Sequence, residues 1–425
     1  MRESFRFPRG FLWGAATSAH QVEGENRNDW TEWERKNARR LAQSAKDNPP
    51  PGGWPGYILK SYPNPLQEEN YISGRACDHY HRFREDFDIA KQLGHNAHRF
   101  SIEWSRIEPE EGKFDEREIE HYREVIRALR ERGLEPFVTL WHYTLPIWVA
   151  QQDGWMNPNA PQWFVRYAER MAVAFKDLVK FWVTQNEPET VARNSYLIGA
   201  RPPQKKNFFL AYSALRRMCR AHVEAYRAMK AINPSFQIGI AETLVYFDAY
   251  KHRLIHRLAL IPLRWWRNNP IFSSFVAASD YIGLEYYFHT RVRLNPWTSQ
   301  WGFQYNENAV VSDLGWELYP QGLLSLLHSL KRYKKPIYIL EHGLADATDQ
   351  HRSWYIRESL KYVAKAIGED VDVRGYLHWS FLDNFEWQGG FWPRFGLVEV
   401  DYKTLVRKIR PSAWEYKKII ESGLA

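Results

Sequence analysis

Cysteine is rare in this chain, and long apolar runs are absent from it. Cys77 and Cys219 are its two cysteines among 425 residues, too few for a disulfide framework, and their scarcity fits a reducing compartment. No run of about 18 apolar residues, the length that crosses a bilayer, occurs. Residues 1–10 carry charges and a proline instead of the apolar stretch of a secretory signal. We therefore expect a cytoplasmic protein with no stable membrane insertion.

A clustered basic region is also missing, although the chain is basic overall. Its formal net charge is +8, a sign that would suit nucleic acid or an anionic membrane surface as a partner. However, lysine and arginine are interleaved with acidic residues, as at residues 116–118, and no nucleic-acid-binding motif accompanies them. We interpret the charge as a solvated basic surface and expect no nucleic-acid partner. The sequence leaves the oligomeric state open.

Tryptophan, in contrast, is abundant, with 20 residues in the chain. Carbohydrate enzymes gather indole rings around their clefts because the flat C–H faces of sugars stack on them. Core packing is the other explanation for so many large aromatic side chains. The positions of the tryptophans in the fold decide between the two.

Short apolar segments alternate with amphipathic helical segments along most of the chain. Helices are predicted at residues 78–93, near 162–176 and at 208–232, and one more begins at Asp115, with Glu118 as its capping-box partner. Eight segments are predicted as strands: 11–15, 97–102, 136–140, 181–184, 237–240, 281–284, 337–340 and 373–377.

Such alternation predicts an α/β fold with a parallel sheet, and eight units close most simply into a barrel. An open doubly wound sheet is the alternative, but no Gly-rich phosphate loop follows an early strand. We predict a single catalytic (β/α)8 TIM barrel domain over residues 1–425, with its active site at the C-terminal ends of the strands.

Residues 37–73 interrupt the alternation. They contain the sequence PPPGG at residues 49–53 and few periodic apolar residues, so a long loop insertion is expected there. Its aromatic residues Trp54, Tyr57 and Tyr62 suggest a lid over the leaving-group side of the site. A disordered surface insertion is the alternative.

Two predicted strands end in a glutamate. Residues 184–188 read TQNEP and contain Glu187, whereas residues 340–343 read LEHG and contain Glu341. These are the fourth and seventh strands, which face each other across a barrel. A carboxylate at the end of an apolar strand is costly unless it is hydrogen-bonded or functional. Each alone could be a structural ion pair, but together they predict a catalytic pair.

Both segments resemble the signatures of glycoside hydrolase family 1, usually TFNEP and TENG. The C-terminal third is most similar to archaeal-type members. The resemblance implies a retaining, exo-acting β-glycosidase that releases terminal β-D-glucosyl, galactosyl or fucosyl residues through a covalent glycosyl-enzyme. Its substrate would be a small β-glycoside or oligosaccharide, with no cofactor and no metal. The similarity continues in order through residues 11–24, 99–106, 378–387 and 394–396.

The resemblance also implies roles for single residues. Glu341 would be the nucleophile and Glu187 the acid/base, with carboxyl groups about 5–5.5 Å apart. Arg99 would keep Glu341 ionised, and the charge of Glu341 would keep Glu187 protonated. A carboxylate at residue 386 would repel a 6-phosphate, so a neutral hexose is expected. The sugar would be bound by Gln21, His142, Asn186, Tyr287, Trp379, Glu386 and Trp387.

Five positions depart from the family pattern, and Glu285 is the most consequential because the family has asparagine there. A third carboxylate could raise the pKa of one or both catalytic groups. Alternatively, Glu285 pairs with His342. The other departures are Tyr143, Gln185, Leu340 and His342.

Two other functions remain as alternatives to hydrolysis. A non-catalytic sugar-binding homologue would be favoured by the loss of either glutamate, and neither is lost. A transglycosylase would use the same two carboxylates and differ in its acceptor site, which the sequence does not disclose.

Overall fold

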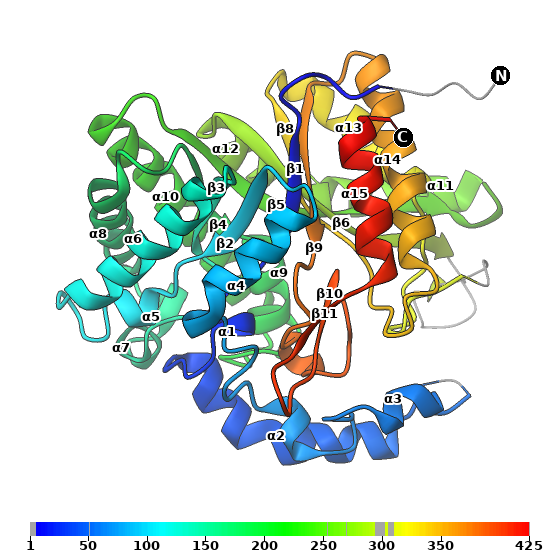
Figure 1. Cartoon of the computed structure of the whole chain (residues 1–425), viewed down its shortest axis with the longest axis horizontal. Coiled ribbons are helices and arrows are strands. Elements are labelled where there is room, and N and C mark those ends of the chain that lie inside the picture. Colours follow the sequence, from blue (N-terminus) through cyan, green and yellow to red (C-terminus); the bar gives the residue numbers. More distant parts are fainter. Residues whose placement is uncertain are drawn as a thin grey trace.

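The computed structural model describes residues 6–50, 52–252, 254–268, 270–293, 302–304 and 310–424. Neighbouring strands pair in the order β5-β4-β3-β2-β1-β9-β8-β6, and β5 also pairs with β6, so the sheet closes into the predicted eight-stranded parallel barrel (Figure 1). The barrel strands are β1 (Leu12–Ala16), β2 (Ala97–Ser101), β3 (Glu135–Trp141), β4 (Phe181–Asn186), β5 (Gln237–Ala249), β6 (Tyr281–Arg293), β8 (Ile337–His342) and β9 (Val373–Trp379).

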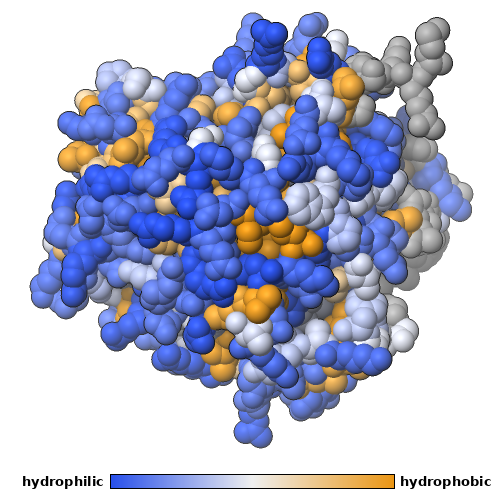
Figure 2. All heavy atoms as spheres, in the orientation of Figure 1, coloured by the Kyte–Doolittle hydropathy of each residue, from blue (hydrophilic) through white to orange (hydrophobic). Residues whose placement is uncertain are grey.

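Helices lie between successive strands, as in a TIM barrel. The longer ones are α4 (His79–Gln92), α6 (Glu116–Glu131), α8 (Ala160–Phe175), α10 (Phe208–Ile232), α11 (Leu254–Asn268), α12 (Pro270–Ala277), α13 (Gln321–Leu330), α14 (Arg352–Gly368) and α15 (Pro411–Ser422). In the described part of the chain, no helix is long and apolar enough to cross a membrane. Figure 2 shows hydrophilic residues over most of one face, with apolar residues in small patches.

Among the described residues, three short strands lie outside the barrel. β7 (Gly302–Gln304) pairs antiparallel with the far end of β6. β10 (Val398–Val400) and β11 (Arg407–Ile409) form a separate antiparallel pair. These strands follow β6 and β9 along the chain, after the strand ends at which an active site is expected.

The structure confirms all eight predicted strands but extends two of them. β5 and β6 continue past the barrel as a paired ribbon, which reaches from Thr243 opposite Glu285 to Ala249 opposite Val292. An apolar cluster that includes Val245 and Leu260 of α11 covers this ribbon. The sequence prediction ended both strands early because polar residues follow, Glu242 and Thr243 in β5 and Glu285 in β6.

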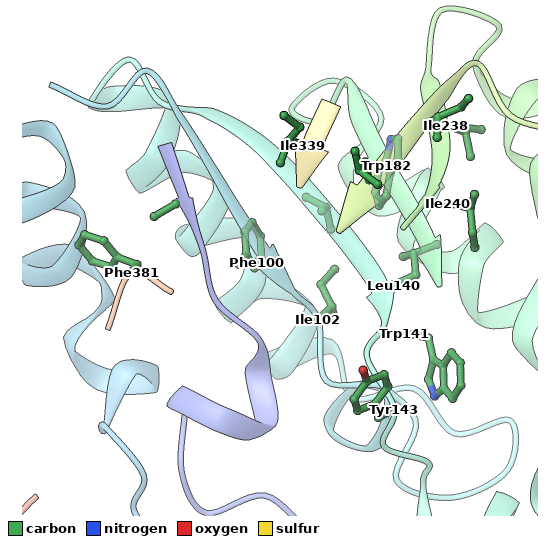
Figure 3. Packing of buried hydrophobic residues seen from close by; sticks show 14 of the residues in the cluster. Phe100, Ile102, Leu140, Trp141, Tyr143, Trp182, Ile238, Ile240, Ile339 and Phe381 are labelled. Atoms are coloured by element: carbon green, nitrogen blue, oxygen red, sulfur yellow. The ribbon is translucent and has the colours of Figure 1, made fainter. Parts of the chain in front are cut away.

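The strands bury both of their faces. Phe137 and Phe181 point into the barrel and stack at 4.5 Å, within a cluster that fills its interior. Their neighbours point outward to the helices, and Figure 3 shows Leu140, Trp182 and Ile240 projecting from adjacent strands in this outer core. Alternation of this kind follows from the two-residue period of a strand. The filled interior leaves the C-terminal rim as the place for a site.

The prediction of a loop at residues 37–73 is wrong for its first part. α2 (Asp29–Asp47) covers residues 37–47, and it begins with a capping box between Asn28 and Thr31. Its buried residues include Trp30 and Trp33, which lie before residue 37, and later only small alanines. The apolar period was therefore hard to recognise. The short helices α3 (Gly56–Lys60) and η1 (Glu68–Tyr71) follow.

Asp115 caps α6 as predicted, because its side chain accepts a hydrogen bond of 2.9 Å from the backbone N–H of Arg117. The predicted reciprocal bond from Glu118 is not formed. Glu118 instead accepts hydrogen bonds of 3.1 Å from the hydroxyl of Tyr80 on α4. The side chain that would complete the capping box therefore joins two helices of the outer ring.

Candidate active site

A cavity of about 240 Å³ opens at the C-terminal ends of the barrel strands. Seven of the residues predicted from the sequence line it: His142, Glu187, Tyr287, Glu341, Trp379, Glu386 and Trp387. The other four, Gln21, Arg99, Asn186 and Glu285, are buried and hydrogen-bonded directly to cavity-lining residues or to one another. The predicted residues therefore form one connected group.

Glu187 and Glu341 lie at the ends of opposite strands, as predicted. Glu187 follows β4, and its backbone N–H donates to the carbonyl of Ala241 on β5 at 2.9 Å. The φ angle of Glu187 is 44°, a left-handed conformation that non-glycine residues rarely adopt and that concentrates at functional sites. Glu341 is the penultimate residue of β8, and the hydroxyl of Tyr287 donates to its Oε2 at 2.9 Å.

Arg99 connects five strand ends beneath the cavity. Its side chain is 1% exposed, and its Nη1 lies 2.8 Å from Glu285 and 2.6 Å from Glu341. Nε donates to Thr139 at 3.0 Å, and Nη2 donates to Asn186. A guanidinium whose three nitrogens each donate to a fixed acceptor holds these side chains in one geometry.

The alternative that Glu285 pairs with His342 is wrong. Glu285 and Glu341 are partners in the register of β6 and β8, so both side chains point inward. His342 points outward, where its Nδ1 lies 2.9 Å from the hydroxyl of Tyr376 and its Nε2 lies 3.4 Å from Ser359. Because adjacent residues of a strand point to opposite faces, the substitution at residue 342 does not reach the site.

Burial raises the pKa of Glu187, Glu285 and Glu341. It raises the pKa of Glu187 to about 8, helped by the charge of Glu341. It raises the pKa of Glu285 to about 8, helped by Glu187 and opposed by Arg99. For Glu341, burial and Glu285 raise the pKa, and they outweigh Arg99 and Tyr287, which lower it. Arg99 was expected to keep Glu341 ionised; it does lower the pKa of Glu341, but burial and Glu285 outweigh this effect. Arg99 contacts two of these carboxyl groups, Glu285 and Glu341, so its charge is shared between them.

Aromatic rings line the part of the cavity beside Glu386. His142 lies nearly parallel to Trp379 and Trp387, with interplanar angles of 19° and 15°. Burial raises the pKa of Glu386 to about 7, and the charge of Arg201 opposes this rise. Behind this wall, Nε2 of Gln21 donates to the carbonyl of Phe385 at 2.9 Å and contacts Glu386 at 3.4 Å.

Some tryptophans lie around the cavity, as in a carbohydrate-binding cleft, and others pack in the core. Trp316, Trp379 and Trp387 line the cavity. The most deeply buried ones are instead part of the core: Trp104, Trp141, Trp155 and Trp182. Abundant tryptophan thus reflects both a ring-lined cavity and ordinary packing.

Sequence reasoning missed the cavity residues that follow β4. Glu187 is succeeded by α9 (Pro188–Val191) and by the π-helix η3 (Ala192–Leu197), a rare form that often occurs at functional sites. No apolar period reveals such a segment, so nothing in the sequence pointed to it. The missed residues of this region are Thr190, Arg193, Asn194 and Arg201. From elsewhere in the chain the missed residues are Phe288 of β6, Trp316, Gln388 and Phe395.

No residue of the 37–73 segment lines the cavity among those described. The segment packs outside it, with the ring of Trp54 against Trp392 at 5.1 Å and the hydroxyl of Tyr57 donating to Asp313 at 2.6 Å. The alternative of a disordered insertion is therefore wrong for these residues, and the lid remains a prediction. Within the described ranges, no three His, Cys, Asp or Glu side chains are grouped as ligands for a metal ion.

Comparison with known proteins assigns a family to this arrangement. The model of glycosyl hydrolase family 1 matches residues 3–253 and 272–424. Beta-glucosidase A of Thermotoga maritima is 31% identical, with 98% of each chain covered. A beta-galactosidase of Sulfolobus acidocaldarius is 30% identical, covering 98% of this chain and 95% of its own.

Solved structures agree with the sequence matches. A beta-glycosidase from Pyrococcus horikoshii superimposes with a TM-score of 0.84 at 34% identity, over 99% of this chain and 96% of its own. The beta-glucosidase of Thermotoga maritima in complex with glucoimidazole gives a TM-score of 0.86 at 29% identity, over 98% and 99% of the two chains.

Proposed function

Because the chain belongs to glycosyl hydrolase family 1 and is a β-glycosidase, we propose that it is a retaining, exo-acting enzyme. Its substrates are small β-glycosides or oligosaccharides, from which it releases terminal β-D-glucosyl, galactosyl or fucosyl residues. The observation that carries this proposal is the pair Glu187 and Glu341, which line one cavity from opposite strand ends. We also propose a cytoplasmic location, which the low number of cysteines supports.

In the first step, a carboxylate oxygen of Glu341 attacks the anomeric carbon, and the bond from that carbon to the leaving-group oxygen breaks. Glu187 transfers its proton to the departing oxygen, so that an alcohol leaves and a glycosyl ester remains on Glu341. The pKa of Glu187, about 8, keeps this proton in place at neutral pH. Arg99 and the Tyr287 hydroxyl stabilise the ionised form of Glu341.

In the second step, water attacks the anomeric carbon of the ester and releases Glu341. Glu187, now ionised, removes the proton of that water and returns to its starting state. Esterification removes the negative charge of Glu341, which is one cause of the raised pKa of Glu187. The pKa of Glu187 therefore falls at the moment when it must act as a base.

The sugar ring lies on the indole of Trp379 in this proposal. His142, Asn186, Glu386 and Trp387 meet its hydroxyls, and Gln21 holds Glu386 in place through the 3.4 Å contact of its Nε2. Groups of this kind discriminate hydroxyl stereochemistry because a mismatch leaves a buried partner unpaired. A neutral hexose fits a wall that contains the carboxyl group of Glu386.

Turnover of 4-nitrophenyl β-D-glucoside, galactoside and fucoside by wild type, Glu187→Gln and Glu341→Gln tests the proposal. Wild type should cleave at least one glycoside, and each variant should lose roughly 10³-fold or more of kcat. The exposed Glu110→Gln is the control and should keep wild-type activity. Equal rates in wild type and both variants would refute the mechanism.

Two further measurements address the finer points. NMR of the first sugar released should show the β-anomer, because two inversions retain configuration, and an α-anomer first product would contradict the double displacement. Adding simple alcohols and measuring alkyl glycoside against free sugar separates hydrolysis from transglycosylation. A protein that binds these glycosides without cleaving any of them would support the non-catalytic alternative.

A further inference from the structure

The helix α11 carries apolar side chains on two opposite faces. One face packs on the ribbon of β5 and β6, where Leu260 is 5% exposed and Leu263 joins the same apolar cluster. On the other face, Leu254, Leu258 and Ile261 are 72%, 57% and 64% exposed. Spacings of four and three residues place these three side chains in one row along the helix. A surface helix of a globular domain needs only its inward face to be apolar, so the fold does not explain the outward row.

The charge of the segment around α11 differs from that of the rest of the chain. Residues 249–279 contain no Asp or Glu, and their five Lys and Arg residues are Lys251, Arg253, Arg257, Arg264 and Arg267. The expectation of evenly interleaved charge is therefore wrong for this segment. Lys251 and Arg257 are exposed. Because Arg257 lies three residues after Leu254 and four before Ile261, it borders the apolar row.

α11 is separate from the residues that form the active site. The family model matches residues 3–253 and 272–424, and α11 lies wholly within the interval between these two segments. Among the described residues, none of α11 lines the cavity. The row of exposed side chains therefore serves a contact other than the one with the sugar.

α11 nevertheless lies at the same end of the barrel as the cavity. The ribbon beneath it continues the C-terminal ends of β5 and β6. Val245 and Val292 of this ribbon form a cluster with Leu260, and Phe288, which lines the cavity, packs against the same cluster. A surface that binds α11 is thus brought to the end of the barrel at which the cavity opens.

We propose that α11 binds the surface of a membrane that contains anionic lipids. The helix lies along the interface, where the row of Leu254, Leu258 and Ile261 enters the apolar boundary of the lipid. Lys251 and Arg257 meet the anionic headgroups. With 15 residues the helix is about 22 Å long, shorter than the hydrocarbon core of about 30 Å, so it lies on the bilayer without crossing it.

An anionic lipid surface explains both features of α11. Nucleic acid would pair with the basic residues and leave the apolar row in water. A second copy of this chain would cover the row, but it would bring the basic, acid-free segments of both copies together, and like charges repel. Lipid buries the row and neutralises the charge at once.

Sedimentation of the full chain with vesicles measures this binding. The vesicles contain either equal amounts of phosphatidylcholine and phosphatidylglycerol or phosphatidylcholine alone. Wild type should bind the mixed vesicles at least about tenfold more strongly, because each basic side chain near an anionic surface adds to the affinity. Added salt should reduce this preference, since it screens the headgroup charges.

Leu258→Ser/Ile261→Ser tests the apolar row. The double variant should bind the mixed vesicles roughly tenfold or more weakly, because two side chains that pass from water into lipid are lost. Val173→Ser/Val406→Ser is the control. These valines are 50% and 58% exposed on other parts of the surface, and their replacement should keep wild-type binding.

Arg257→Gln tests the charge. It should weaken binding to the mixed vesicles about fivefold and leave binding to phosphatidylcholine alone unchanged. Lys46→Gln is the control, because Lys46 is an exposed cation on α2, and it should change neither. A loss of binding in Lys46→Gln equal to that in Arg257→Gln would show that net charge alone is responsible, and would overturn the assignment to α11.

The variants replace exposed side chains, so their unfolding in urea should match that of wild type. Absence of wild-type binding to the mixed vesicles at low salt overturns the proposal, and so does binding that survives in Leu258→Ser/Ile261→Ser. Sedimentation velocity without lipid tests the second copy. A wild-type dimer that this double variant loses, together with no vesicle binding, would assign the row to a dimer interface instead. Vesicle binding is measured without a glycoside, so its result is independent of the proposed function.

Discussion

Glu285 and Glu341 share one hydrogen-bond donor. Nη1 of Arg99 lies 2.8 Å from the first and 2.6 Å from the second, and the two glutamates are register partners on β6 and β8. Glu341 lines the cavity, whereas Glu285 is 0% exposed and lies behind it. The charge of Glu285 therefore acts on the site without a direct place in the cavity wall.

Glu285→Gln should move the acidic limb of the kcat/KM profile to lower pH. Glu285 raises the pKa of Glu341, and the acidic limb reports ionisation of the nucleophile in the free enzyme. An amide keeps the shape and removes the charge, so Glu341 ionises more easily. The profile is measured with 4-nitrophenyl β-D-glucoside from pH 3 to 10, with Glu110→Gln as control. An acidic limb that stays in place would show that Glu285 does not couple to Glu341.

Tyr287→Phe should move the acidic limb of the kcat/KM profile to higher pH. The hydroxyl of Tyr287 donates to Glu341 and lowers its pKa, so its removal makes the nucleophile harder to ionise. We also expect kcat/KM at the optimum to fall by roughly 10- to 100-fold, as for other lost charge-assisted hydrogen bonds.

The neighbouring tyrosine provides a matched control for this prediction. Tyr286 points outward, and its hydroxyl donates to the carbonyl of Tyr319 at 2.8 Å. Tyr286→Phe should therefore cost about 1 kcal/mol of folding free energy and leave the pH profile unchanged. Identical profiles for the two variants would refute a specific role of the Tyr287 hydroxyl.

Asp383→Asn should destabilise the protein in a pH-dependent way. Asp383 lies 2.8 Å from Arg410, and the charges of Arg410 and Arg394 lower its pKa against the effect of burial. A carboxyl group whose pKa is lowered by folding stabilises the protein at pH values above its pKa in the unfolded chain, about 3.9. This stabilisation is lost as the pH falls through its pKa in the folded protein. Breaking this buried pair should cost about 3–5 kcal/mol at pH 7.

Urea unfolding at pH 7 and at successively lower pH measures this difference. The difference in unfolding free energy between wild type and Asp383→Asn should become smaller below about pH 4, because the wild-type carboxyl then becomes protonated. Asp372→Asn is the control, since Asp372 pairs with Arg374 at the exposed surface and should cost less than about 1 kcal/mol. A gap that is constant with pH would show that lost packing, and not charge, explains the destabilisation.

The sequence predicted the barrel well because its strands are short, buried on both faces and separated by amphipathic helices. Glu187 and Glu341 could be placed on opposite strands from the strand count alone. α2 was missed because its buried positions beyond residue 37 are the small residues Ala38 and Ala42. The pairing of Glu285 with His342 was wrong because residue alternation on β6 and β8 sends the two side chains to opposite faces.

Arg201 could not be predicted from the sequence as a cavity residue, for a different reason. It belongs to irregular backbone after a π-helix, and its neighbour Gln388 is 187 positions away along the chain. Neither period nor motif relates the two, and only the closed barrel brings them together. Both residues line the cavity, so this part of its wall could not be predicted from the sequence.

Asn70 connects the 37–73 segment to the loop that carries Glu386 and Trp387. Its Oδ1 accepts hydrogen bonds from the backbone N–H groups of Phe391 at 3.0 Å and Trp392 at 2.9 Å. Its Nδ2 donates to the carbonyl of Gly389 at 3.0 Å. Asn70 is 0% exposed, so water does not replace these bonds when the side chain is removed.

Asn70→Ala should therefore weaken sugar binding more than it slows the chemical step. Orphaned backbone groups should cost about 2 kcal/mol of folding free energy, and KM for an aryl β-glucoside should rise while kcat changes little. Asn48→Ala is the control, because Asn48 is exposed at the end of α2 and should alter neither constant. Unfolding in urea and steady-state kinetics measure both effects. If KM stays at its wild-type value while stability falls, Asn70 braces the fold without positioning Glu386 and Trp387.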